Sequence, residues 1–235
     1  MDTSEQKLDV YEKQAAYYDA IYAAQGKDYE KEAGEIRRVI EQYKTSKGND
    51  LLDVGCGTGG HFSFLAEWYS VEGLDLDGHM LAVAKKRFPE VPFHQADMVE
   101  FDLDKQFDAV TCLFSGIGYT KTLEKMQSAI VTMAKHVKPG GVLVIEPWLS
   151  PEQWEVGTPH AVFVNKSDLK ISRINVSDRK DNVSILDFHL TVATPGHIED
   201  FRELHELGLF TTEQYLQGFE KAGLEVKHDP KGITG

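Results

Sequence analysis

Residues 51–62, LLDVGCGTGGHF, join a buried apolar run to a glycine-rich loop and then to the start of a helix. Glycines at such a junction let the backbone turn sharply and approach a ligand without a Cβ in the way. The free amides at the N-terminus of the following helix favour an anionic group. This segment therefore predicts a ligand site at the carboxyl end of a strand in an α/β sheet.

The chain from residue 51 to residue 148 alternates short apolar runs with helix-like segments. Predicted strands cover residues 51–56, 71–76, 91–98, 107–114 and 141–148. Predicted helices cover residues 61–69, 79–88 and 122–137. Strands that alternate with helices imply parallel pairing and right-handed crossovers. The expected fold class is α/β, a doubly wound, mostly parallel Rossmann-like sheet.

Different patterns flank this region. Residues 8–45 are helix-like and rich in tyrosine, with Gly26 separating two helices and Asp28 as an N-cap. Residues 161–210 contain β-leaning runs without helices, which predicts an antiparallel insertion after the fifth strand. A capping box at Thr211 then opens a helix, and residues 224–228 are predicted as a last strand. The expected regions are an N-terminal helical lid (1–48), a core (49–150), an insertion (151–210) and a return to the core (211–235).

Composition excludes several function classes. The 235 residues carry a formal net charge of −13, which disfavours nucleic acid and anionic membranes as partners. The two cysteines, Cys56 and Cys112, are too few for a cysteine-based zinc site, so we expect buried free thiols and no metal. The sequence shows neither a transmembrane stretch nor a secretory signal, so the expected location is cytoplasmic.

Three acids follow the first three predicted strands and bear on the cofactor. Asp53 lies just before the glycine loop, Asp75 ends the second strand and Asp97 ends the third. A carboxylate at Asp53 favours the ammonium and sulfonium of S-adenosylmethionine (SAM) and would repel a pyrophosphate. Asp75 can accept hydrogen bonds from ribose hydroxyls, and Asp97 from the adenine amino group. The glycines also satisfy the dinucleotide spacing G-x-G-x-x-G, so an NAD-dependent oxidoreductase stays open.

At these residues the chain resembles the class I SAM-dependent methyltransferases. A closer resemblance is to the sugar N,N-dimethyltransferases that finish TDP-desosamine and TDP-mycaminose in macrolide biosynthesis. The residues that carry it are LDVGCGTG (52–59), GKDYEKEA (26–33), FSGIGY (114–119), IEPWLSPEQW (145–154) and LHELGLFTTEQYLQGFEKAGLEV (204–226). The resemblance implies a SAM-dependent N-methyltransferase for a small-molecule acceptor, with an antiparallel insertion and an active homodimer.

The resemblance also implies roles for matching positions. The implied cofactor residues are Tyr22, Tyr29, Asp53, Gly55, Gly57, Gly59, Asp75, Leu76, Asp97, Met98 and Leu113. Of these, Leu76 would pack on the adenine, Met98 would meet its edge, and Leu113 would lie near the methionine moiety. Two departures stand out. The family carries a further strand after the segment matching residues 232–235, and it has two tryptophans where this chain has Trp148 and Leu149, which leaves the sugar specificity open.

Methyl transfer is an in-line displacement at a sulfonium, and most of its catalysis can come from positioning and desolvation. Tyr119, Glu146 and Tyr11 are the catalytic candidates, because an amine acceptor needs a partner for its proton. Candidate substrate contacts are Tyr18, Trp148 and Arg173, the last toward a diphosphate unless it lies on a solvated hairpin. We interpret His61, His189, His197 and His205 as structural. A non-catalytic SAM-binding protein is the remaining alternative.

Overall fold

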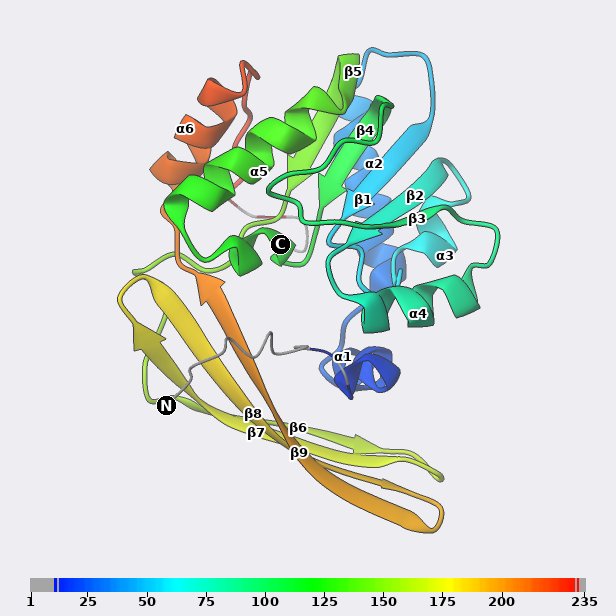
Figure 1. Cartoon of the computed structure of the whole chain (residues 1–235), viewed down its shortest axis with the longest axis vertical. Helices are drawn as coiled ribbons and strands as arrows, with labels where there is room; N and C mark the ends of the chain where they lie inside the picture. Colours follow the sequence, from blue (N-terminus) through cyan, green and yellow to red (C-terminus); the bar gives the residue numbers. More distant parts are fainter. Residues whose placement is uncertain (1–10, 12, 231, 233–235) are drawn as a thin grey trace, which may run out of the picture.

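The structure, a computed structural model, describes residue 11, residues 13–230 and residue 232. It has an α/β body and, below it, a long antiparallel sheet (Figure 1). Part of the predicted lid lies outside the described residues. Most of the segment 232–235 lies outside them as well.

A five-stranded parallel sheet forms the centre of the α/β body, in the order β3-β2-β1-β4-β5. Its strands are β1 (Asp50–Val54), β2 (Ser70–Asp75), β3 (Phe93–Gln95), β4 (Phe107–Cys112) and β5 (Val137–Ile145). The central strands β1 and β4 are buried along nearly all of their length, because helices cover both faces of the sheet. The predicted fold class is confirmed.

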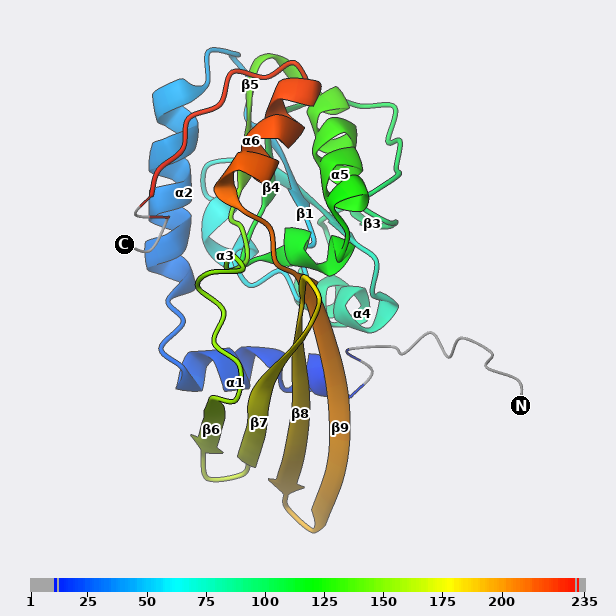
Figure 2. The same cartoon turned by 90° about the vertical axis from the view of Figure 1, so that its left-hand side faces the viewer.

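Helices cover the two faces of this sheet (Figure 2). Their bounds are α2 (Tyr29–Tyr43), α3 (Phe62–Leu65), α4 (Gly78–Arg87), α5 (Leu123–Lys135) and α6 (Thr212–Lys221). A further helix, α1 (Tyr18–Ala24), packs on the antiparallel sheet, and two 3-10 turns are η1 (Gln14–Ala16) and η2 (Gly116–Thr120). On one face α2 packs through Ile36 and Ile40, while α5 and α6 pack on the other through Met126 and Tyr215. The buried strip of α2 follows the helical period of its apolar residues.

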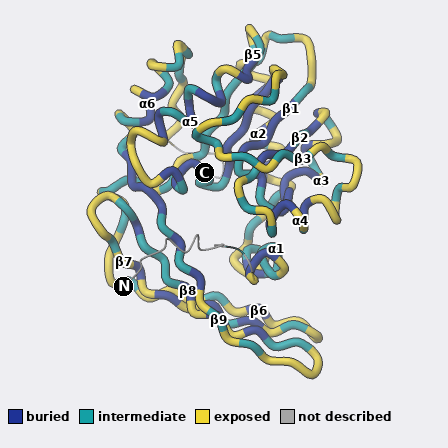
Figure 3. The backbone as a smooth tube through the Cα atoms, in the orientation of Figure 1, coloured by how far each residue is buried: buried dark blue, intermediate teal, exposed yellow. Residues whose placement is uncertain are grey.

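The antiparallel sheet follows β5 and leads back to the core. Its strands are β6 (Pro159–Asn165), β7 (Lys170–Lys180), β8 (Val183–Thr194) and β9 (His197–Gly208), in that order. Alternate residues on its inner face, among them Ile171 and Phe188, pack against Ile21 of α1. Figure 3 shows buried residues alternating with exposed ones along these strands, as expected for a sheet with one solvated face.

Several local predictions are confirmed. Asp28 caps α2 by accepting a hydrogen bond from the Lys31 amide, and the Thr211 capping box opens α6. Cys56 and Cys112 are buried free thiols.

Two predicted elements are wrong. Residues 224–228 form no strand, because the segment does not pair with the β5 edge and instead runs toward α2, where Asp229 and Lys227 interact with Arg38 and Tyr43. The predicted helix at 61–69 shortens to α3, because the amides of Glu67 and Trp68 bond to carbonyls three residues back and form turns.

Candidate active site

The site lies where the strand order reverses, between β1 and β4, which is where open α/β sheets bind ligands. The glycine loop follows β1, and η2 follows β4. The N-terminal helix α1 and the inner face of the antiparallel sheet close this edge from the opposite side (Figure 1). The fold therefore brings residues from three separate sequence regions to one place.

The glycine loop has a conformation that only glycine adopts without strain. Gly55, Gly57 and Gly59 have φ angles of +74°, +55° and +72°. The Gly57 amide donates to the Asp75 carboxylate across an N···O distance of 2.8 Å, which fastens the loop to the end of β2. A Cβ at Gly60 would lie 2.6 Å from the Tyr29 ring, so the lid and loop are in close contact.

Two carboxyl groups, the buried Asp53 and the partly buried Asp75, lie beneath this loop. Asp53, 2% exposed, accepts a hydrogen bond from the Thr111 hydroxyl at 2.8 Å. Asp75 accepts from the amides of Gly57 and Asp77, each at 2.8 Å. Burial raises the pKa of each carboxyl to about 6, although the hydrogen bonds oppose this rise. Both groups are ionised above that pH and favour a cationic ligand.

Four other predicted cofactor residues, Leu76, Asp97, Met98 and Leu113, lie at the same edge of the parallel sheet but differ in burial and contacts. Leu113 is buried after β4, and the Met98 side chain reaches to within 3.6 Å of the Cβ position at Gly55. Leu76 is exposed beside Asp75. Asp97 caps its own turn by accepting from the Val99 amide at 2.9 Å, which leaves its second carboxylate oxygen for another donor.

A small cleft of about 40 Å³ lies over the glycine loop. Its lining residues are Tyr18, Tyr29, Asp53, Gly55, Cys56, Gly57, Thr58, Gly60, His61, Leu113 and Phe114. Sites for small organic ligands are usually larger than about 300 Å³. The cleft is therefore smaller than a nucleoside requires, with Tyr18 and Tyr29 among the side chains that fill it. The positive-φ loop and the two acids beneath it, Asp53 and Asp75, fit a cationic amino-acid nucleoside such as SAM.

The predicted lid tyrosines form a connected aromatic cluster. The ring centroids of Tyr18 and Tyr22 are 4.5 Å apart, and those of Tyr11 and Tyr18 are 5.9 Å apart. Tyr22 meets Phe114 of the loop after β4 at 4.9 Å. Tyr29 packs on His61 instead, at 4.9 Å. The cluster thus runs from the glycine loop to the antiparallel sheet.

Polar contacts that sequence reasoning missed hold this lid to the loop. The Thr58 hydroxyl donates to Asp19 of α1 at 2.8 Å, and Arg87 of α4 forms an ion pair with the same carboxylate at 2.5 Å. On the other side, Lys27 forms a 2.6 Å ion pair with Glu32, which also contacts His61. Nothing in the spacing of these residues along the chain pointed to such contacts.

The three catalytic candidates are not equivalent in the structure. Tyr11 and Tyr119 are joined by a hydrogen bond of 2.5 Å between their hydroxyls. Burial raises the pKa of both groups well above the ordinary tyrosine value, so both hydroxyls stay protonated. Glu146 instead accepts from the Phe114 amide at 2.6 Å, where Phe114 and Ser115 have positive φ angles of 47° and 63°. Glu146 therefore holds the loop after β4 in shape.

The predicted substrate contacts beyond the lid lie on the antiparallel sheet or near it. Arg173, 5% exposed, donates to the Gln25 side chain at 3.1 Å and lies over the rings of Tyr22 and Phe188. It is not on a solvated hairpin, since its strand position faces the lid. Trp148 donates to the Ser184 hydroxyl at 2.9 Å and packs on Trp154, at the junction of the two sheets.

The antiparallel sheet adds further polar residues that the sequence did not single out. The Tyr119 hydroxyl is 2.7 Å from Nδ1 of His205, for which the sequence pattern predicts only a structural role. Among the described residues, several buried polar atoms lack a hydrogen-bond partner: Gln14 Oε1 and Nε2, Arg173 Nη1, Asn175 Nδ2, Glu203 Oε2 and His205 Nε2. Buried polar groups are normally paired, so this cluster is suited to a polar ligand.

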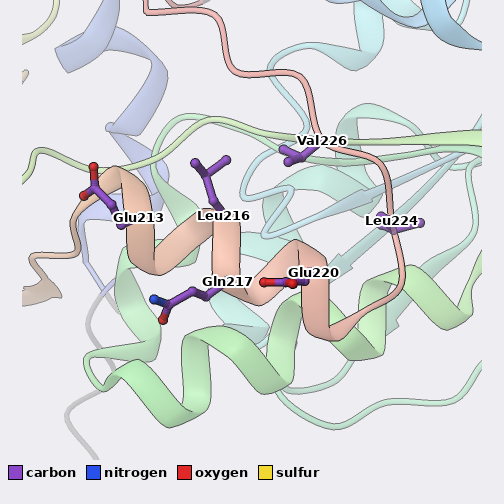
Figure 4. A pocket seen from close by; sticks show the side chains of 6 residues that line it. All are labelled: Glu213, Leu216, Gln217, Glu220, Leu224 and Val226. Carbon is purple, nitrogen blue, oxygen red and sulfur yellow. The ribbon is translucent and has the colours of Figure 1, made fainter.

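A larger groove of about 470 Å³ lies elsewhere, between α6 and the segment 224–226 (Figure 4). Leu216, Leu224 and Val226 line it together with Glu213, Gln217 and Glu220. It holds no nucleophile, histidine or glycine loop, so it is not the candidate active site. Across the part of the chain that the structure describes, no cluster of His, Cys, Asp or Glu could hold a metal ion. No helix in that part is long and apolar enough to cross a membrane.

Comparisons with known proteins agree with this geometry. Residues 51–141 match the methyltransferase domain family. The dTDP-3-amino-3,4,6-trideoxy-alpha-D-glucopyranose N,N-dimethyltransferase of Streptomyces venezuelae is 39% identical over 223 residues, which cover 94% of each chain. The crystal structure of Streptomyces venezuelae DesVI has a TM-score of 0.89 at 37% identity, covering 94% of each chain. SAM-bound CalS10, an amino pentose methyltransferase from Micromonospora echinaspora, has a TM-score of 0.80 at 38% identity, covering 88% of each chain.

Proposed function

Because this chain belongs to the SAM-dependent methyltransferase family that includes the dTDP-amino-sugar N,N-dimethyltransferases, we propose that it methylates the nitrogen of a nucleotide-linked amino sugar. The observation that carries this proposal is the buried polar cluster at the antiparallel sheet, which contacts the same lid tyrosines that reach the cleft over the glycine loop. A site for a large polar acceptor thus adjoins the site for SAM.

SAM supplies a methyl group on a positively charged sulfur. The proposed cradle for it is the loop of Gly55, Gly57 and Gly59. Asp75 would accept from the ribose hydroxyls and Asp53 would face the ammonium group. Burial raises the pKa of both carboxyl groups to about 6, which is still below neutral pH. Both acids would therefore be charged at neutral pH, as a cationic ligand requires. Asp97, Met98 and Leu76 would surround the adenine.

For the acceptor, Arg173 is the proposed contact to the diphosphate. Its guanidinium is buried, and none of the described carboxylates lies within ion-pair distance of it. A buried cation without a charged partner is costly, and an anionic ligand would offset that cost. The guanidinium lies over the Tyr22 and Phe188 rings, so the phosphates would bind at the sheet and the sugar nearer Tyr18 and Tyr119.

The reaction needs a free lone pair on the acceptor nitrogen, in line with the methyl group. Closure of the lid tyrosines over the loop would exclude water and fix that alignment. Tyr11 and Tyr119 would hydrogen-bond the amine. Glu146 would act indirectly, by fixing the loop at Phe114 and Ser115.

We also propose a homodimer that functions in the cytoplasm. Its support is a group of exposed apolar side chains on the outer face of β6 and β7, namely Phe163, Ile174 and Val176. A second copy of the chain would cover such a patch. Light scattering of the wild type and of Phe163→Glu tests this, and a wild-type monomer would contradict it.

The test of the proposed function is methyl transfer with SAM to a panel of acceptors. It contains dTDP-3-amino and dTDP-4-amino sugars, the same sugars without the nucleotide, and simple amines. We expect transfer to a dTDP-amino sugar and at least tenfold lower kcat/KM for the free sugar. Equal rates with simple amines would contradict the proposed acceptor class. Binding of SAM without transfer to any acceptor would instead favour a non-catalytic SAM-binding protein.

A further inference from the structure

A line of polar groups runs from the lid into the antiparallel sheet. The Tyr11 hydroxyl meets the Tyr119 hydroxyl at 2.5 Å, and the Tyr119 hydroxyl meets His205 Nδ1 at 2.7 Å. On the far side of the imidazole, Nε2 is 3.6 Å from Oε2 of Glu203. His205 is 2% exposed and Glu203 7% exposed, so the inner end of this line is shielded from solvent.

The contacts of Glu203 fix the direction of the protons in this line. Its Oε1 accepts from the Gln14 amide at 2.9 Å, whereas its Oε2 and His205 Nε2 have no other hydrogen-bond partner among the described residues. A proton on Nε2 would face this carboxylate, which favours that tautomer of the imidazole. Nδ1 is then an acceptor, so Tyr119 donates to it. The Tyr119 oxygen consequently keeps a lone pair for another donor.

We propose that His205, backed by Glu203, is a positioning residue that takes up the proton of the acceptor amine through Tyr119. This rests on the proposed function. The bound ammonium gives a proton to the Tyr119 oxygen while the Tyr119 proton passes to His205 Nδ1. The freed nitrogen lone pair forms the N–C bond as the C–S bond breaks, which leaves S-adenosylhomocysteine and a methylated ammonium. The imidazolium returns its proton to water when the products leave.

The electrostatic environment of His205 is consistent with this role. The titratable and charged groups that face it are Tyr11, Tyr119, Arg173 and Glu203. Burial lowers the pKa of the imidazole, Arg173 lowers it further, and Glu203 opposes both. His205 is therefore neutral at rest and free to accept a proton. Glu203 then stabilises the imidazolium that forms.

The test compares the pH profiles of kcat for the wild type and His205→Gln with a dTDP-amino sugar that the wild type methylates. Glutamine can accept from Tyr119 but cannot take its proton. The rate of the variant should follow the fraction of free amine. We expect at least a tenfold deficit at about pH 7 that shrinks to less than threefold at about pH 9.5, near the pKa range of alkyl amines.

The matched control is His136→Gln. His136 is also buried, donates to the Thr132 carbonyl and accepts from the Leu103 amide, but lies at the end of α5 outside the site. A loss of stability alone would give a ratio to the wild type that does not change with pH, which is the result expected for this control. Glu203→Gln should show a smaller deficit with the same pH dependence. It provides the same test if His205→Gln does not fold.

Nitrogen NMR gives a readout that needs no turnover. In protein with 15N-labelled histidine, the ring signals of His205 should report an unprotonated Nδ1 and a protonated Nε2 at about pH 7. A pH-independent deficit in His205→Gln, or a protonated Nδ1 in the wild type, would overturn the proposal. A wild type that methylates no dTDP-amino sugar would overturn the proposed function instead, so the two failures are distinguishable.

Discussion

Replacing Asp53 with asparagine should stabilise the protein and weaken SAM binding. The carboxyl is buried, and burial raises its pKa from 3.8 to about 6. At about 1.36 kcal/mol per pKa unit, keeping this group ionised in the folded state costs about 3 kcal/mol. Asparagine preserves the acceptor for the Thr111 hydroxyl and removes the charge. We expect a gain of about 2 kcal/mol in unfolding free energy at about pH 8, since the new amide group faces the cleft without a fixed partner.

The gain in unfolding free energy should depend on pH. The folded pKa lies above the unfolded one, so the cost is fully present above about pH 6 and disappears as the pH falls toward 3.8. Urea unfolding without SAM, at about pH 8 and about pH 5, should therefore show the gain falling from about 2 kcal/mol to about 0.6 kcal/mol. In the same variant, calorimetry should show SAM binding at least tenfold weaker, because the ammonium loses its carboxylate.

Asp108→Asn is the control with the opposite sign. Asp108 is equally buried, but Lys138 and backbone amides hold its pKa at about 2 against the effect of burial. Its contribution to stability is present above about pH 4 and is lost as the pH falls toward 2, so the asparagine variant should be less stable at neutral pH. A gain for Asp53→Asn that is the same at both pH values, or a loss at about pH 8, would refute the reasoning.

Three further predictions concern the cofactor loop and the acceptor side. Asp75→Asn removes the charge that faces the ribose and should weaken SAM binding by about 1.5–3 kcal/mol, tenfold to a hundredfold, in calorimetry; unchanged affinity would contradict the ribose role. Gly57→Val places a branched residue at a φ of +55° and should abolish SAM binding while circular dichroism stays near wild type. Tyr119→Phe and Glu146→Gln should each lower kcat about tenfold with SAM affinity nearly unchanged; wild-type kcat/KM in both would remove these residues from the mechanism.

The sequence predicted the parallel core because each of its signals is local. The glycine loop, the acids after strands and the capping box at Thr211 all act within a few residues of one another. Asp28 and Thr211 cap their helices as expected. The edge strand of the core was harder to predict from the sequence, because a segment forms a strand only when a neighbouring strand pairs with it. Residues 224–228 have a strand-like pattern but turn away from β5.

The acceptor side could be predicted only in part. Tyr11 and Tyr119 were named, but their contact spans more than a hundred positions of the chain, and no pattern in the sequence encodes it. His205 was assigned a structural role because its spacing fits no metal site. The register of β9 and the position of η2 bring it to Tyr119. The sequence did contain one signal for this role of His205. Glu203, His205 and Leu207 occupy alternate positions of β9 that face inward, and two of these three buried residues are polar.

The most direct test of the central claim is to locate the transferred methyl group. The enzyme is incubated with SAM carrying a 13C-labelled methyl group and a dTDP-amino sugar labelled with 15N at its amino group. Nitrogen–carbon correlated NMR of the product should show the label bonded to the amino nitrogen, with loss of that signal in Gly57→Val. A label on oxygen, or turnover that continues in Gly57→Val, would contradict the account.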